Sequence, residues 1–275
     1  MSITMKIFIV TLSRKLVLIK HILFGILIGI SVIVPGLSGG TTALMLGIYS
    51  DIIDFADNLL IDFKKSFKFF TPLIAGAVIG IGFISFPLRF ILDRFSLEFS
   101  FFVIGIILGS ISLFTNSIFK SPIKNFLCIS AGITICFLLD SFFGNSYVYN
   151  DSSIVLLLIG LLSAIALILP GISLSYILIA FDYYEKIILA ITNLNILFLL
   201  KFGASILLST VLIIKILNKL YKKYPISINM LILGMVIGSI RQVFIRFPSS
   251  NELLVCILVF SLGIIVSFTL SFVKE

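Results

Sequence analysis

Charged residues are scarce in this chain, and their scarcity excludes an ordinary soluble protein. Of its 275 residues, 12% are charged and 60% are hydrophobic, whereas an average soluble domain has about 25% charged and roughly 45 to 50% apolar residues. A soluble chain of this length would need a charged surface to cover its core. The composition therefore predicts a membrane protein.

Histidine, cysteine and tryptophan are rare or absent. The chain has one histidine, His21, no tryptophan, and three cysteines, Cys128, Cys136 and Cys256. The cysteines lie inside apolar runs without metal-ligand or C-x-x-C spacing, so we expect buried core thiols and neither a metal nor another cofactor. The 20 basic residues form no continuous basic surface, which argues against nucleic acid as a partner.

The scarcity of histidine also argues against an enzyme. Residues 36–40 fit the G-x-S-x-G pattern of a nucleophile elbow centred on Ser38, but that chemistry needs a histidine base, which hydrolases place after the serine and the acid. His21 comes before Ser38, at the basic edge of an apolar run. We therefore expect no enzymatic activity.

Residues 1–20 do not have the pattern of a cleavable signal peptide. Their apolar run, residues 7–12, is short and is followed by Arg14, Lys15 and Lys20 rather than by small residues. We expect this segment to be retained as a basic amphipathic helix on the inner membrane surface.

Six apolar segments approach the roughly 20 residues that a helix needs to cross the hydrocarbon core. They are 69–88, 99–118, 126–143, 196–214, 226–245 and 253–273. Two further runs, 22–34 and 155–169, are too short to cross alone and stop at the Pro-Gly pairs 35–36 and 170–171. Because proline removes a backbone donor and clashes with the preceding turn, each pair predicts a broken helix or a re-entrant helical hairpin.

The two broken regions match each other at an offset of 135. Ser38 corresponds to Ser173 and Tyr49 to Tyr184, while a downstream Gly-Ser-Ile element recurs at an offset of 129. This predicts a duplicated unit, with a first membrane repeat at 21–143 and a second at 156–273, in one integrated membrane domain.

Each repeat would hold one hairpin and three crossings, and an odd number of crossings turns the second repeat upside down. With the N-terminus in the cytoplasm, 14 Lys and Arg residues fall inside and 6 outside, as the positive-inside rule requires, and the predicted external loop 144–153 has none. The outer set is Arg89, Arg94, Lys186, Lys201, Arg241 and Arg246. If both hairpins crossed fully, the repeats would be parallel instead.

The predicted fold class is therefore all-α. We expect a polytopic membrane protein with an inverted repeat, two re-entrant or broken helical hairpins and about six full transmembrane helices.

The paired breaks form the predicted substrate site. Helix breaks at bilayer depth leave backbone groups unpaired unless protein, water or a ligand satisfies them. In inverted-repeat transporters, half-helix N-termini at such breaks face anionic groups, so a phosphate or carboxylate is expected here. The candidates are Pro35, Gly36, Ser38, Gly39, Gly40 and Thr41 in the first copy and Pro170, Gly171, Ser173 and Ser175 in the second. The alternative is a Gly/Ser-lined packing turn.

Two arginines outside the turns are further candidates for binding the phosphate. Arg241 follows the repeated Gly-Ser-Ile element in an apolar helix, and its guanidinium could bind a phosphate through two hydrogen bonds. Snorkelling to the outer interface is the alternative. Arg94, between two predicted spans on the outer side, could collect anionic headgroups or act only as an interfacial anchor.

The same segments carry a family resemblance. Pro35-Gly-Leu-Ser-Gly-Gly-Thr41 followed by Gly47-Ile-Tyr49, and Leu169-Pro-Gly-Ile-Ser173 followed by Tyr184-Glu185, resemble the two signature segments of the DUF368 membrane family. The resemblance extends over nearly the whole chain. It implies a flippase that returns undecaprenyl phosphate, a polyprenyl phosphate, across the bacterial cytoplasmic membrane for reuse in cell-envelope synthesis.

The chain departs from the family pattern at three positions. Val32 stands where the family often has an acidic residue, Leu174 stands where the second motif usually has glycine, and Asp182 takes the place that corresponds to Gly47. Val32 has no ionisable group, which argues against a proton-coupling role of that position. Leu174 is larger than glycine and narrows the second turn.

Together these observations predict a carrier that holds the phosphate of an anionic polyprenyl-phosphate lipid between the two turns. Access would alternate, and the polyprenyl tail would stay in the bilayer among the membrane lipids. The alternatives are a small-anion or solute secondary transporter of similar architecture and a non-transporting membrane scaffold. A lipid carrier needs a site that opens sideways to the bilayer, a solute carrier needs an enclosed aqueous cavity, and a scaffold needs neither.

Overall fold

Every element in the described part of the chain is helical. The computed structural model describes residues 3–59, 61–114, 121–143 and 153–272, so most of the predicted external loop, residues 144–152, lies outside the described residues. The first half contains α1 (Ile3–Ile33), α2 (Gly39–Met45), α3 (Tyr49–Asp57), α4 (Phe63–Arg94), α5 (Ser96–Gly109), the 3-10 helix η1 (Ser110–Phe114) and α7 (Pro122–Phe143). The second half contains α8 (Ser153–Ile168), α9 (Leu174–Ala180), α10 (Tyr183–Thr192), α11 (Ile196–Lys223), α12 (Pro225–Gly238), α13 (Ile240–Val243) and α14 (Ser250–Phe272).

Six of the described helical segments are long and apolar enough to cross a membrane. They are Lys15–Ile33, Phe63–Ser85, Ser96–Phe114, Ile196–Lys223, Pro225–Val243 and Ser250–Ser271. The all-α, polytopic fold class is confirmed. Five of these segments coincide with predicted spans.

The sixth segment differs from the prediction. We expected the apolar run that ends at Val34 to be too short to cross alone, but α1 continues through the basic segment into this run as one helix. Residues 16–19 are apolar and nothing between Lys15 and His21 breaks a helix, so the run is extended toward the N-terminus. The predicted span 126–143 lies within α7, a helix of 22 residues, Pro122–Phe143, whose apolar part is described as far as Leu138.

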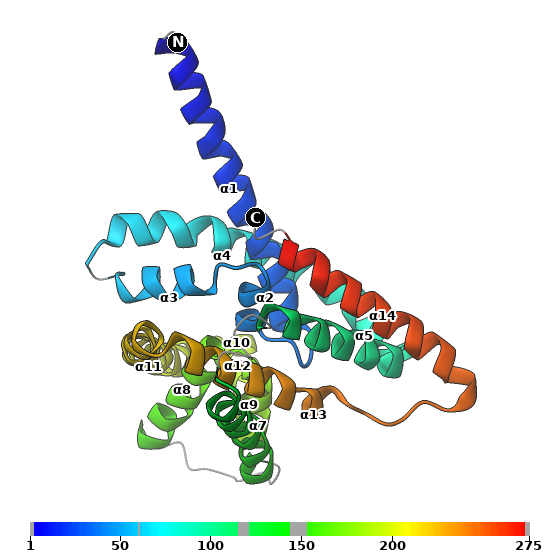
Figure 1. The fold of residues 1–275 in the computed structure, drawn as a ribbon. Helices are drawn as coiled ribbons and strands as arrows, with labels where there is room; N and C mark the ends of the chain where they lie inside the picture. Colours follow the sequence, from blue (N-terminus) through cyan, green and yellow to red (C-terminus); the bar gives the residue numbers. More distant parts are fainter. Residues whose placement is uncertain (1–2, 60, 115–120, 144–152, 273–275) are drawn as a thin grey trace.

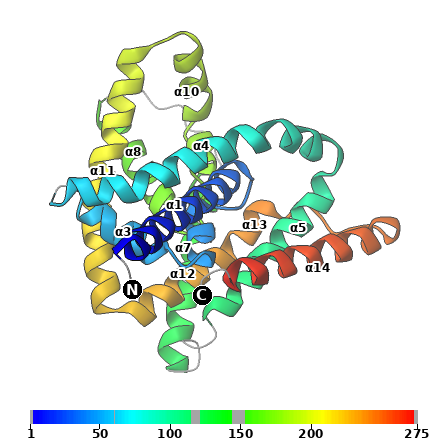
Figure 2. The ribbon, with the colours of Figure 1, turned by 90° about the horizontal axis from the view of Figure 1, so that it is seen from above.

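The helices pack in pairs that recur in the two halves (Figures 1 and 2). α1 packs along α4 in the first half, and α8 packs along α11 in the second. Two other pairs join the halves, because α5 packs along α14 and α12 packs along α7. The two halves of the chain are therefore interlocked.

Glycines set the distance between the helices that join the halves. A side chain on Gly105 in α5 would collide with the backbone of Phe260 in α14, and a side chain on Gly234 in α12 would collide with the backbone of Ile129 in α7. Small residues of this kind let helix backbones approach closely. The glycines of the two contacts correspond at an offset of 129, and Ile129 and Phe260 correspond at an offset of 131.

The described interior contains two buried apolar clusters, one centred on the elements α1 to α5 and one on α8 to α11. Cys136 and Cys256 are buried as predicted, whereas Cys128 is half-buried. Large side chains such as Phe83 and Leu254 are mostly exposed, which suits a surface surrounded by lipid.

Candidate functional site

The first Pro-Gly turn separates α1 from α2. Pro35 cannot continue the helix, and Gly36 adopts a φ of +81°, a left-handed conformation that favours glycine. Ser38 then caps α2, because its Oγ accepts a hydrogen bond from the Thr41 N–H at 3.1 Å. The local sequence therefore accounts for this turn.

The second turn has the same backbone shape but a different cap. Gly171 has a φ of +88° between α8 and α9, while Ser173 occupies the N-cap position without making a side-chain capping hydrogen bond. The equivalence extends beyond the turns, since Gly47 and Asp182 have φ values of +72° and +61°. Asp182 therefore keeps the conformation of the glycine that it replaces.

The two turns meet. The Gly171 N–H donates a hydrogen bond to Ser38 Oγ at 3.2 Å, and Gly40 packs against Pro170. The hydroxyl of Tyr49 in α3 donates to the carbonyl oxygen of Ile168, the last residue of α8, at 3.1 Å. Burial, and to a lesser degree Tyr221, raises the pKa of Tyr49, so its hydroxyl remains a donor.

Ser38 uses most of its hydrogen-bonding capacity to hold this arrangement. A hydroxyl group has one donor and two acceptor positions. Ser38 Oγ accepts from the N–H groups of Thr41 and Gly171 and lies 3.0 Å from Thr41 Oγ1, to which it can donate. In this conformation Ser38 therefore joins the two turns.

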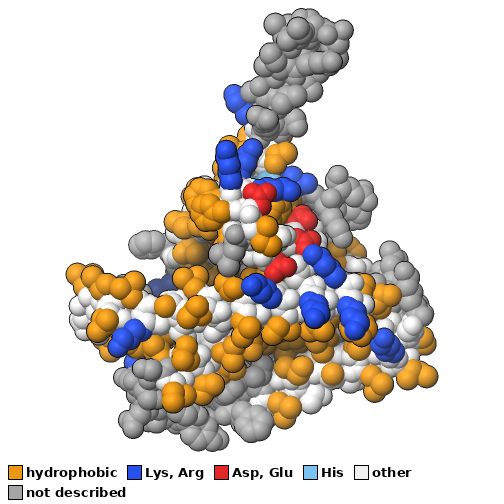
Figure 3. All heavy atoms as spheres, turned by 90° about the vertical axis from the view of Figure 1, so that its left-hand side faces the viewer, with side chains coloured by type: hydrophobic (Ala, Val, Ile, Leu, Met, Phe, Trp, Pro, Cys, Tyr) orange, Lys and Arg blue, Asp and Glu red, His pale blue; other side chains and the backbone are white. Residues whose placement is uncertain are grey.

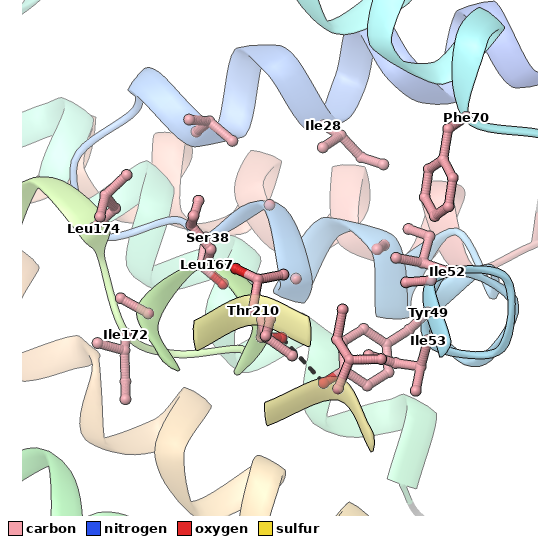
Figure 4. A pocket seen from close by; sticks show the side chains of 18 of the residues that line it. Ile28, Ser38, Tyr49, Ile52, Ile53, Phe70, Leu167, Ile172, Leu174 and Thr210 are labelled. Atoms are coloured by element: carbon pink, nitrogen blue, oxygen red, sulfur yellow. Dashed lines mark hydrogen bonds between the residues drawn. The ribbon is translucent and has the colours of Figure 1, made fainter. Parts of the chain in front are cut away.

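An apolar cavity of about 550 Å³ lies beside the paired turns (Figure 4). Its walls come from α1, α2, α3, α4 and α11, from both turns and from the end of α8. Four lining residues carry hydroxyls, namely Ser38, Tyr49, Ser173 and Thr210, and none of the lining residues is charged. The cavity therefore has hydrocarbon walls with a few neutral polar groups.

Thr210 is a site residue that the sequence did not reveal. It lies in α11, and its Oγ1 is buried without a hydrogen-bond partner among the described residues. A buried hydroxyl without a partner costs free energy, so this atom favours a polar group in the cavity. The only sequence signal was a hydroxyl side chain inside an apolar span.

The predicted turn residues lie at different distances from the cavity. Ser38, Gly39, Gly40 and Ser173 line it. Thr41, Pro170 and Gly171 contact those lining residues. Gly36, which follows Pro35, faces Val243 of α13. Ser175 lies in α9, with its side chain outside the described residues.

The two predicted arginines do not line the cavity. Arg94 is exposed at the C-terminal end of α4. Arg241 is exposed in α13, with its guanidinium carbon 5.9 Å from the centre of the Phe137 ring in α7. The structure therefore separates these cations from the hydroxyl groups of the turns.

The polar face of α3 lies against charged residues (Figure 3). Lys222 Nζ of α11 lies 3.0 Å from Asp54 Oδ1, and Asn218 Nδ2 of α11 donates to Asp57 Oδ2 at 2.7 Å. Figure 3 shows acidic side chains among basic ones on this side of the molecule. The apolar residues Ile52 and Ile53 of α3 line the cavity. α3 is therefore amphipathic: its apolar side faces the cavity and its polar side is bonded to α11.

Within the described ranges, no cluster of His, Cys, Asp and Glu could hold a metal ion.

The G-x-S-x-G segment does not assemble a catalytic pair in the described residues. The side-chain hydroxyl of Ser38 bonds to Thr41 and Gly171, whereas His21 Nδ1 lies 2.7 Å from the carbonyl oxygen of Val17 and its ring packs edge-on to Phe69. The serine and the histidine are thus engaged with different partners.

Comparisons with known proteins agree with one another. Residues 28–254 match a family described as VCA0040-like, undecaprenyl phosphate translocase-like. A polyprenyl-phosphate transporter of Staphylococcus aureus (strain NCTC 8325 / PS 47) is 32% identical over 268 residues, covering 91% of this chain and 95% of that protein. A polyprenyl-phosphate transporter of Vibrio cholerae serotype O1 (strain ATCC 39315 / El Tor Inaba N16961) is 23% identical over 234 residues, covering 80% and 75%. No solved structure matches.

Proposed function

This chain belongs to the undecaprenyl phosphate translocase-like family, and on that premise we propose that it carries polyprenyl phosphate across the bacterial cytoplasmic membrane. The predicted DUF368 resemblance is confirmed. Six apolar helical segments provide a membrane domain for this activity. The transport would return the lipid carrier for reuse in cell-envelope synthesis. The N-terminus of the protein would lie in the cytoplasm.

The chemistry of the cavity supports a lipid substrate over an aqueous solute. A path for a small hydrated anion needs polar or charged walls, because stripping an ion of water without replacement contacts is costly. The residues that line this cavity are mostly aliphatic and none is charged. The walls therefore suit a hydrocarbon chain better than a hydrated ion.

The phosphate would bind at the paired turns. Ser173 and Thr210 line the same cavity as Gly39 and Gly40 and offer hydroxyl donors to it. Neutral donors would hold the phosphate only weakly, which suits a carrier that must release its substrate. Arg94 and Arg241 would act earlier, by collecting the anionic headgroup at the outer membrane surface.

Access would alternate through an inverted repeat. α3 packs on α2 and α4 of its own half and also on α11 of the other half, whereas its equivalent α10 packs on α9 and α11, which both belong to its own half. This difference between two equivalent helices supports a protein with two states, of which this is one. In the other state α10 would pack on α4 and α3 would leave α11.

The observation that carries the proposal is the contact between the two Pro-Gly turns at one end of an apolar cavity. Purified protein in liposomes, assayed for movement of polyprenyl phosphate between leaflets, tests it. We expect movement faster than in empty liposomes, with little movement of a bulk phospholipid. An aqueous phosphate flux without lipid movement would favour a solute transporter instead.

A further inference from the structure

The cavity reaches the lipid-facing surface of the molecule. Among its lining residues, Ile74 of α4 is 60% exposed and Leu207 of α11 is 68% exposed. A residue that lines a cavity and is also exposed lies at its rim. Both residues belong to membrane-crossing segments, so the cavity opens at bilayer depth.

The rim joins two helix pairs. Val32 of α1 and Leu167 of α8 also line the cavity and are partly exposed, so one side of the opening belongs to the α1 and α4 pair and the other to the α8 and α11 pair. All four rim residues are aliphatic. An opening of this composition admits hydrocarbon and disfavours water and ions.

The cavity has few polar groups and large apolar walls. Ser38 and Ser173 lie at the turns, the Tyr49 hydroxyl is bonded to Ile168 at the end of α8, and Thr210 lies in α11. Phe70 and Leu59 belong to the apolar part formed by α3, α4 and their connection. A ligand with one polar end and a hydrocarbon body matches this arrangement. The volume, about 550 Å³, lies in the usual range of small-molecule sites, roughly 300–1,000 Å³, and is too small for a whole long-chain lipid.

We propose that the isoprene units next to the phosphate occupy this cavity and that the chain leaves it between α4 and α11, across Ile74 and Leu207. This inference rests on the proposed function and revises one expectation, because only the distal part of the tail stays in the bilayer. The carrier would then recognise the branched hydrocarbon chain as well as the phosphate.

Two neighbouring leucines provide a matched test. Leu207 and Leu208 are both 68% exposed on α11, but only Leu207 lines the cavity. A tryptophan at position 207 would place a larger side chain across the rim of the cavity, whereas a tryptophan at position 208 would add the same bulk outside it. In liposomes we expect Leu207→Trp to slow polyprenyl phosphate movement about tenfold, and Leu208→Trp to leave the rate at the wild-type level.

Cross-linking reports occupancy independently of transport. Leu207→p-benzoylphenylalanine, irradiated in liposomes that contain labelled polyprenyl phosphate, should attach the label through the hydrocarbon chain, and the same replacement at Leu208 should attach much less. Excess unlabelled polyprenyl phosphate should abolish the labelling at position 207, and excess phospholipid should not.

The outcomes separate the two proposals. Wild-type transport with equal rates for the two tryptophan variants and equal labelling at the two positions would overturn the inference and leave the proposed function standing. Labelling that phospholipid abolishes would assign the cavity to bulk acyl chains and also overturn the inference. If the wild type moves no polyprenyl phosphate, the proposed function fails, and selective labelling at position 207 still decides whether the chain binds.

Discussion

The backbone N–H of Gly171 donates a hydrogen bond to the Ser38 hydroxyl over 3.2 Å, and so joins two turns whose residues lie 133 positions apart. The bond is asymmetric although the two turns are equivalent: its donor is a backbone group of the second turn and its acceptor is a side chain of the first turn. Ser173, the equivalent of Ser38, makes no such cap. The turns are thus alike in backbone conformation and different in bonding.

This difference predicts unequal effects of two matched serine substitutions. Ser38→Ala removes the acceptor of the Thr41 and Gly171 N–H groups, and loss of an N-cap alone costs about 0.5–2 kcal/mol. Ser173→Ala removes no capping bond. Thermal unfolding in detergent should therefore show a lower midpoint for Ser38→Ala and a nearly unchanged one for Ser173→Ala. Equal midpoints for the two variants would contradict the assigned role of Ser38.

Tyr49 predicts a pH-dependent part of the stability. Burial raises the pKa of Tyr49 above its ordinary value of 10.0. Just above pH 10, the folded protein therefore keeps the phenol proton that the unfolded chain releases. Stability from this residue is complete below pH 10 and falls as the pH rises above 10. Tyr49→Phe should be less stable at neutral pH by about 1–3 kcal/mol, because the Ile168 carbonyl loses its donor.

The alkaline loss of stability should also be smaller in Tyr49→Phe than in the wild type. Chemical denaturation at a series of pH values measures both effects. Tyr184→Phe, at the equivalent but exposed position, is the control. An alkaline loss in Tyr49→Phe as steep as that of the wild type would show that Tyr49 is not its source.

Two glycines of α4 should respond to alanine in opposite directions. A side chain on Gly80 would collide with the backbone of Ile26 in α1, whereas Gly82 has open space around it. Gly80→Ala should destabilise the protein by about 1–3 kcal/mol through overpacking. Gly82→Ala should stabilise it slightly, by about 0.5–1 kcal/mol, since alanine favours helix. The thermal unfolding midpoints of the two variants measure both effects. A midpoint of Gly80→Ala equal to that of the wild type would show that α1 and α4 do not approach closely at Gly80.

Inversion of the repeats can be tested at the ends of two equivalent helices. Ser121 precedes α7 and Ser250 begins α14, and both are exposed. In a variant without the native cysteines, Ser121→Cys should react with a membrane-impermeant thiol reagent from the cytoplasmic side and Ser250→Cys from the opposite side. Reaction of both from the same side would establish the parallel arrangement.

Local chemistry explains why the turns were predictable. Proline cannot continue the preceding helix and glycine tolerates a positive φ, whatever surrounds them, so the breaks at residues 35–36 and 170–171 follow from the sequence. Asp182 could be aligned with Gly47 because the offset of 135 that relates the two turns also relates these residues. The apolar spans were predictable because the bilayer imposes their length and composition.

The continuity of α1 was missed although the local sequence allows it, whereas the helix packing could not be read from the sequence. The charges of Lys15 and Lys20 suggested a surface helix, but long basic side chains are tolerated near the interface and α1 continues through them. Thr210 lines the cavity only because α11 faces α3 and both turns. The exposure of Arg241 beside Phe137 depends on the pairing of α12 with α7, which no local pattern fixes.

Transport by a reversibly locked carrier tests the central claim most directly. Asp57→Cys and Asn218→Cys together, in a variant without the native cysteines, would place two thiols where the side chains of α3 and α11 now meet at 2.7 Å. In liposomes we predict that the reduced protein moves polyprenyl phosphate between leaflets, that a short bis-thiosulfonate cross-linker, which spans the gap left by the shorter cysteine side chains, stops this movement, and that a reductant, which cleaves the cross-link, restores it. Movement no faster than in empty liposomes, for the reduced pair and for the wild type, would contradict the account.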